Sequence, residues 1–322
     1  MEKKFVVTAS PFVRNNLAST QSIMRDVCIA LLPAVVASVY FFGLKALILL
    51  VLSTVSAVFF EALFQKLGKS KIRIYDCSAA VTGLLVGLNL PSSAPYWMPI
   101  FGSLIAIVLV KQLFGGIGQN FMNPAMIART IMFLSWTALM SARILPQADN
   151  FFAGFSSDVD LVSVATPLAH GEQFGLWDLL IGNIPGMMGE TSKLALLLGG
   201  LYLLYRRVID WRLPVSIIAT VFILSYLHTG IIYTSESGVQ NALGQILSGG
   251  LFIGAFFMAT DYVTSPLHRT GRIVGGILCG IIIFVIRAYG SYPEGTSFAV
   301  LFLNVMTPLI DRYTRPKSFG EA

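Results

Sequence analysis

Four consecutive residues, Gly189, Glu190, Thr191 and Ser192, stand directly before an apolar run and have the clearest capacity for chemistry in this chain. A hydroxyl here can cap a helix by accepting a bond from a free backbone N–H, and a carboxylate suits the positive end of a helix. The preceding residues 185–189 contain two glycines, which let the backbone approach a bulky group. A helix N-terminus preceded by glycine also favours phosphate, and Lys193 would add a positive contact. The segment therefore predicts either a simple helix cap or an anchor for a phosphate group.

The elements that position this segment are predicted to be membrane helices. The 322 residues are 55% hydrophobic and 12% charged, and the mean hydropathy is +0.75. Apolar stretches close to the roughly 20 residues that one membrane crossing needs recur between short polar joints. We therefore expect an all-α polytopic membrane protein with about ten transmembrane helices. The expected spans are residues 27–42, 46–64, 77–90, 97–114, 122–141, 192–206, 213–230, 242–260, 273–289 and 296–311.

The positive charges predict the orientation of these spans. The first 26 residues lack the features of a cleaved signal peptide, so the first span should direct insertion and leave the N-terminus in the cytoplasm. Basic residues then fall in alternate loops and in the C-terminal tail, as the positive-inside rule requires. This placement accounts for the net charge of +6 without a nucleic-acid partner, and both termini are predicted to be cytoplasmic. These basic residues are Lys66, Lys69, Lys71, Arg73, Lys111, Arg206, Arg207, Arg212, Arg269, Arg272, Arg312, Arg315 and Lys317.

Residues 142–191 form one long segment on the predicted outer face. Its charged side chains are all acidic except for that of Arg143. Because it leaves five spans on each side, an internal repeat would be inverted across the membrane. Each half contains a proline break, a glycine-led span and then an asparagine close to a proline. Spans 77–90 and 192–206 are short, which is typical of interrupted helices around a buried site. The predicted units are a cytoplasmic segment 1–26, a first repeat 27–141, the outer loop 142–191, a second repeat 192–311 and a tail 312–322.

Four further polar residues are candidates for handling an ion or a cofactor inside the apolar regions. Asp261 precedes a turn broken by proline, and a role in binding competes there with simple anchoring at the interface. Asn123 and Asn304 occupy similar places in the two halves, where they would close a helix break or join helices. Arg129 follows Asn123 in the same stretch. Other ionisable residues near span ends are Glu61, Asp76, Arg287 and Asp311.

The histidines and cysteines predict no metal or iron–sulfur centre. His170, His228 and His268 are isolated and lack the spacing of metal ligands. Cys28, Cys77 and Cys279 are far apart and form no CxxC pair, so we expect them to fill apolar space.

Four motifs give the chain a resemblance to a known family along almost its whole length. They are "FMNPAMIAR" at 121–129, "PGMMGETS" at 185–192, "FMATDYVTSP" at 257–266 and "YPEGTSFAVLFLN" at 292–304. Together they resemble the D subunit of the Rnf complex and its relative, the B subunit of the Na⁺-translocating NADH:quinone reductase. The resemblance implies that Thr191 carries FMN through a phosphoester made by a flavin transferase. It also implies a fold shared with urea transporters, and allows a second, non-covalent flavin such as riboflavin.

The function implied by this resemblance is electron transfer between reduced ferredoxin and NAD⁺, coupled to Na⁺ or H⁺ translocation in a bacterial inner membrane. The expected partners are the A, E and G membrane subunits of Rnf and its B and C peripheral subunits. This chain has no dinucleotide fingerprint and no cluster cysteines, so it would hold no complete site for ferredoxin or NAD. The inverted repeats alone equally allow a solute channel or transporter without a redox cofactor.

Overall fold

The computed structural model describes residues 19–69, 72–144, 146, 175–232, 238–290 and 294–316. The described part of the chain is helical and contains no β-strand, which confirms the expected all-α class. Two helices, Thr20–Leu67 and Arg269–Tyr289, have the length and apolar composition needed to cross a membrane. The other apolar helices in these ranges are shorter, namely Ser78–Leu88, Trp97–Gln112, Pro124–Ser135, Lys193–Tyr205 and the stretch 212–228.

The first half of the chain begins with α1 (Thr20–Leu67), which joins two of the expected spans across a kink. The kink is at Gly43, where φ is 70° and ψ is −159°, a conformation that disfavours a side chain. The helix starts at Ser19, whose hydroxyl accepts a bond of 3.2 Å from Ser22 N. The elements that follow are η1 (Ile74–Asp76), α2 (Ser78–Leu88), α3 (Trp97–Leu104), the π-helical η2 (Ile105–Gln112), α4 (Pro124–Ser135) and α5 (Thr137–Ser141).

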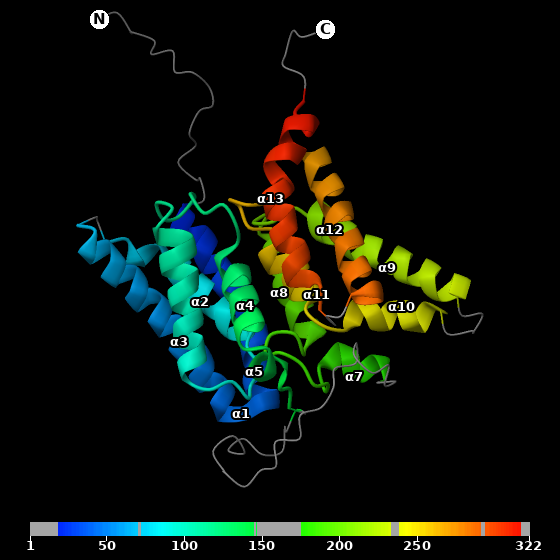
Figure 1. Cartoon of the computed structure of the whole chain (residues 1–322), viewed down its shortest axis with the longest axis horizontal. Helices are drawn as coiled ribbons and strands as arrows, with labels where there is room; N and C mark the ends of the chain where they lie inside the picture. Colours follow the sequence, from blue (N-terminus) through cyan, green and yellow to red (C-terminus); the bar gives the residue numbers. More distant parts are fainter. Residues whose placement is uncertain are drawn as a thin grey trace, which may run out of the picture.

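The second half lies beside the first in Figure 1, with α8 and α4 near the middle of the view. In this view α7 and α10 run across the direction of α12 and α13, and α10 packs against α9 and α7. The elements are α7 (Leu176–Ile181), α8 (Lys193–Tyr205), α9 (Arg212–Ile232), α10 (Gly238–Leu247), α11 (Leu251–Ile253), the π-helical η4 (Gly254–Met258), α12 (Arg269–Tyr289) and α13 (Thr296–Thr314).

Two expected spans are interrupted rather than continuous. Stretch 122–141 divides at Trp136, whose φ of −131° and ψ of 57° end α4. Stretch 242–260 divides between α10 and α11, where Gly249 has a φ of 64°. The apolar pattern of the sequence shows neither break, because each break depends on the backbone conformation of one residue.

The two shortest expected spans are short helices in the structure. Helix α2 has 11 residues and α8 has 13, so at about 1.5 Å per residue neither reaches the roughly 30 Å of a hydrocarbon core. Irregular backbone next to such helices must be enclosed by protein. Accordingly, Asn89 and Leu90, which follow α2, are fully buried.

Irregular segments from the two halves, one after α2 and one before α8, contact one another in the core. Gly189 N donates to Leu88 O at 2.7 Å, and Met188 N donates to Leu90 O at 3.1 Å. The side chain of Ser38 adds a bond of 2.7 Å to Met188 O. The segment that precedes α8 is therefore held against the end of α2 by its own backbone.

We predict that Gly189→Ala destabilises the protein, because a Cβ at this position would lie 2.6 Å from Leu88 Cβ and 2.9 Å from Leu88 O. Overpacking of this kind costs about 1–3 kcal/mol, which a lower melting temperature of the purified protein would report. The matched control is Gly186→Ala, whose Cβ would meet Thr191 Cγ2 at an ordinary 3.6 Å. Equal melting temperatures for the two variants would contradict the packing of this segment on α2.

Candidate functional site

The two hydroxyl groups next to α8 have different surroundings. Ser192 is the N-cap of α8, and its hydroxyl accepts a bond of 3.3 Å from Ala195 N. Thr191 does not cap the helix, and among the described residues its hydroxyl donates one long hydrogen bond of 3.4 Å, to Met188 O. Thr191 is 1% exposed. The two neighbouring hydroxyl groups therefore differ, because Ser192 caps the helix and Thr191 does not.

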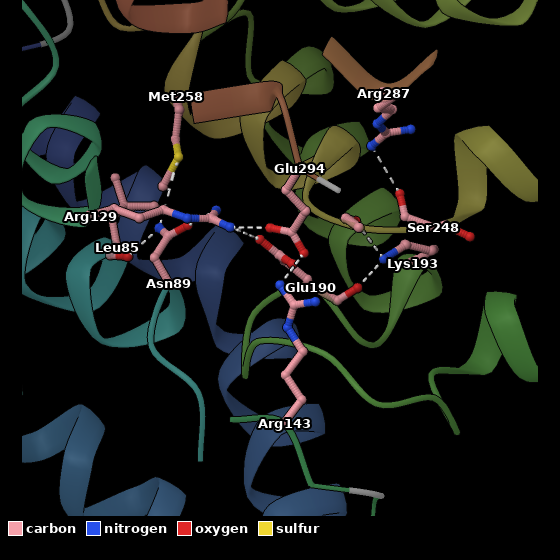
Figure 2. Close-up of polar contacts among 11 residues, drawn as sticks. Leu85, Asn89, Arg129, Arg143, Glu190, Lys193, Ser248, Met258, Arg287 and Glu294 are labelled. Atoms are coloured by element: carbon pink, nitrogen blue, oxygen red, sulfur yellow. Dashed lines mark hydrogen bonds and ion pairs between the residues drawn. The ribbon is translucent and has the colours of Figure 1, made fainter. Parts of the chain in front are cut away.

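Glu190, immediately before Thr191, takes part in a buried charged network (Figure 2). Its carboxylate lies 2.7 Å from Arg129 Nη2 and is 1% exposed. Gly250 leaves the space for this carboxylate, since a Cβ there would lie 2.5 Å from Glu190 Oε1. Arg129, on α4, also donates to Asn89 Oδ1 at 2.7 Å and pairs with Glu294. One guanidinium therefore connects the ends of three chain segments.

Further cations surround this network. Arg143 Nη2 lies 2.8 Å from Glu294 Oε1. Lys193, which is fully buried, donates to Glu190 O and, at 2.9 Å, to Gly249 O. Arg287, on α12, donates to Gln245 O and, at 3.2 Å, to Ser248 O. Lys193 and Arg287 thus bind carbonyl groups at the end of α10, where a helix dipole favours cations.

We call the six ionisable residues here the charged cluster. It consists of Arg129, Arg143, Lys193, Arg287, Glu190 and Glu294. With every group ionised, four positive charges stand against two negative ones. Several polar atoms of this region are buried without a hydrogen-bond partner: Arg143 Nε, Arg287 Nε, Thr296 Oγ1 and both carboxylate oxygens of Glu190. Because isolated buried charge is costly, this composition suits a bound anion.

The pKa values of the two carboxyl groups move in opposite directions. Both groups lie in connecting segments, before α8 and α13 respectively. Burial raises the pKa of Glu190, and the opposing charge of Arg129 does not cancel this effect. Burial also raises the pKa of Glu294, but Arg143 and Arg129 outweigh it and lower the pKa to about 2.

Asn123 and Asn304, expected at matching places in the two halves, are in direct contact. Asn123 caps α4 by accepting bonds from Ala125 N at 3.0 Å and Met126 N at 3.3 Å, and it donates to Met258 O at 3.1 Å. With its amide oriented to satisfy both atoms, Asn304 accepts from Asn123 N at 3.0 Å. These amides close helix breaks and join the halves.

Asp261 lies apart from the charged cluster, on the wall of a cavity of about 350 Å³. Its carboxylate accepts a bond of 3.3 Å from Thr264 Oγ1. The cavity also presents Asn120, Asn123 and Lys111, together with aromatic Phe256. Its size and its mixture of apolar walls with a few polar groups are those of a small-molecule site.

The other ionisable residues near span ends have local partners. Glu61 forms a buried ion pair of 3.0 Å with Lys111 of η2. Asp311 accepts from Leu267 N at 3.0 Å, and Asp76 accepts from Ser78 N at the same distance. His228 contacts aromatic rings, the three cysteines are free, and no metal-binding group is present in the described ranges. His170 and most of the acidic segment lie outside the described residues.

The four sequence motifs contribute residues to the charged cluster or to contacts at the cavity. Arg129, Glu190 and Glu294 come from three of the motifs and meet in the charged cluster. Met258, from the fourth, accepts the bond from Asn123. Motifs far apart in the sequence thus line one interior region.

Comparison with known proteins gives a consistent result. The model of the NQR2, RnfD, RnfE family matches residues 6–320. The chain belongs to this family. It is 43% identical to the D component of the Na⁺-translocating ferredoxin:NAD⁺ oxidoreductase complex of Acetobacterium woodii, over 99% of this chain and 96% of the relative. It is 39% identical to the D component of the proton-translocating complex of Clostridium ljungdahlii, with 98% and 96% covered. The D component of an ion-translocating oxidoreductase complex from Escherichia coli is 35% identical, with 98% of each chain covered.

Membership of this family, together with the apolar helices, makes the chain a membrane protein. The relatives from Acetobacterium woodii and Clostridium ljungdahlii carry different ions in their names, so family membership alone does not fix the ion.

Proposed function

We propose that this chain is a subunit of an ion-translocating ferredoxin:NAD⁺ oxidoreductase complex and carries FMN bound through a phosphoester to Thr191. The names of full-length relatives at 35–43% identity support the complex. The observation that carries the flavin proposal is the hydroxyl of Thr191, which does not cap α8 and, within the described ranges, makes one long hydrogen bond.

The surroundings of Thr191 fit an anionic group. A phosphodiester carries one negative charge, and the adjoining charged cluster has two more cations than carboxylates. Buried donors without partners, Arg143 Nε and Arg287 Nε, belong to the same region. The bound flavin would supply reversible electron transfer, for which the chain's own side chains offer no equivalent. Because Thr191 is buried, we expect the flavin transferase to act before the segment packs on α2.

We further propose that the cavity beside Asp261 holds a second, non-covalent flavin such as riboflavin. Asp261, Asn120 and Lys111 would bind the polar edge of the ring, while Phe256 and Phe257 would contact its face. A cavity of about 350 Å³ that combines apolar walls with a few polar groups suits a ring system of this kind.

The membrane arrangement we propose is ten spans in two inverted five-helix repeats, as in urea transporters, with both termini in the cytoplasm of a bacterium and the chain in its inner membrane. Contacts between matching positions, Asn123 with Asn304, support the repeat. The proposed partners are the A, E and G membrane subunits, the B and C peripheral subunits, and the flavin transferase.

In-gel fluorescence tests this proposal. The chain is produced together with an active flavin transferase, boiled and run on a denaturing gel under ultraviolet light. We expect a fluorescent band at the mass of this chain. A dark band would favour the alternative of a channel or transporter without a redox cofactor.

A further inference from the structure

The charged cluster contains two carboxyl groups that share one guanidinium nitrogen. Glu190 Oε1 and Glu294 Oε2 both lie against Nη2 of Arg129, which brings the two carboxyl groups next to one another. Their side chains are 1% and 9% exposed. Ionised carboxylates only accept hydrogen bonds, so the two groups can bond to one another only when one of them holds a proton.

The unpartnered atoms of Glu190 lead to the same conclusion. When both groups are ionised, neither oxygen of Glu190 has a hydrogen-bond donor, although Arg129 supplies an ion pair at 2.7 Å. Two like charges this close cannot both remain ionised in a buried site without a large cost. A single shared proton satisfies an oxygen of Glu190 and removes the repulsion.

We infer that Glu190 and Glu294 together hold one exchangeable proton, and that reduction of the flavin on Thr191 adds a second proton to this pair. The first part concerns the chain alone, and the second part rests on the proposed function. Glu190 is bonded through the backbone to Thr191, so negative charge gained by a group on Thr191 would raise the proton affinity of the pair.

The proposed step is balanced in charge and atoms. The pair with one proton carries one negative charge. The free carboxylate forms one O–H bond as an O–H bond of a solvent hydronium ion breaks, which leaves a water molecule and an uncharged pair. The electrons come from the reduced donor of the complex and stay on the flavin, and oxidation reverses the step. The charged groups that face the pair are Arg129 on α4, Arg143 after α5, Lys193 on α8 and Arg287 on α12. These cations oppose a second proton until the flavin becomes more negative.

Infrared difference spectroscopy of the whole purified complex tests both parts. In complex assembled without the flavin transferase, an alkaline pH jump should remove a carboxylic acid C=O band that shifts in heavy water. Glu294→Gln should abolish this band. Glu61→Gln, which changes another buried carboxylate far along α1, should leave it in place. A missing band in the wild type, or an unchanged band in Glu294→Gln, overturns the shared proton.

The flavin-loaded complex tests the coupling. Electrochemical reduction should produce a new carboxylic acid band in the wild type and in Glu61→Gln, but not in Glu294→Gln. The flavin potential should also depend less on pH in Glu294→Gln. If Glu294→Gln fails to assemble, the infrared spectrum of the wild-type complex still tests the coupling. Reduction of the wild type without a new carboxylic acid band overturns it. Absence of gel fluorescence would instead contradict the proposed function. The infrared result from the complex that lacks flavin would still hold.

Discussion

Thr191→Ala is expected to remove the covalent flavin completely, so that the band of this chain is dark on a denaturing gel. The reason is chemical, since a phosphoester needs a hydroxyl and alanine offers none. The readout is the ratio of fluorescence to protein stain in chain produced with an active flavin transferase. Thr191→Ser keeps a hydroxyl and should remain fluorescent.

Ser192→Ala is the matched control for that experiment. It removes the adjacent hydroxyl, which accepts from Ala195 N, and such a lost cap costs about 1 kcal/mol of stability. We expect slightly lower stability and full fluorescence. Loss of fluorescence in Ser192→Ala, with retention in Thr191→Ala, would place the attachment on Ser192 instead.

Arg129→Met is expected to destabilise the protein more than any other single change considered for the charged cluster. Methionine fills a similar volume but leaves Glu190 and Glu294 without the cation between them, and Asn89 Oδ1 without its donor. Removing one partner of a buried ion pair costs about 3–5 kcal/mol. The measurements are the melting temperature of the purified protein and the amount assembled in the membrane.

Arg206→Met provides the comparison, because Arg206 also forms an ion pair, at 3.1 Å to Asp26, but its side chain is 50% exposed. Water screens a pair this exposed, so Arg206→Met should lower the melting temperature far less than Arg129→Met. If the two variants were equally stable, the charged cluster would not join the chain segments as described.

Much of the helical architecture follows from the sequence because apolar length and polar joints determine where helices form. Each expected apolar stretch contains a helix, and the short stretches around α2 and α8 are short helices. The breaks at Trp136 and Gly249 were missed because one backbone conformation ends each helix. The sequence predicted two separate first spans, but they form the single helix α1, because Gly43 kinks this helix without ending it.

The candidate site was predicted only in part, because its contacts join distant segments. Glu190 and Lys193 were expected together beside Thr191, and Arg129 was expected apart from them; the structure brings all three into one cluster. Lys193 was expected to meet a phosphate, but its ammonium group binds two backbone carbonyls. Asp261 belongs to the other site, at the cavity.

Asn89, Arg143 and Glu294 were missed as site residues, although two of them carried a signal. Arg143 is the single basic residue in an acidic segment, which suggests a buried acidic partner. Glu294 precedes Gly295 and Thr296 at the start of the last apolar run, much as Glu190 precedes Thr191. Asn89 offered no such signal, because its role depends on the end of α2 meeting α4.

Mass spectrometry of the peptide containing residues 189–193 tests the central claim most directly. The complex should be isolated from membranes that show ferredoxin-dependent NAD⁺ reduction. The account predicts that this peptide carries FMN, with the added mass located on Thr191. An unmodified peptide from an active complex would contradict it.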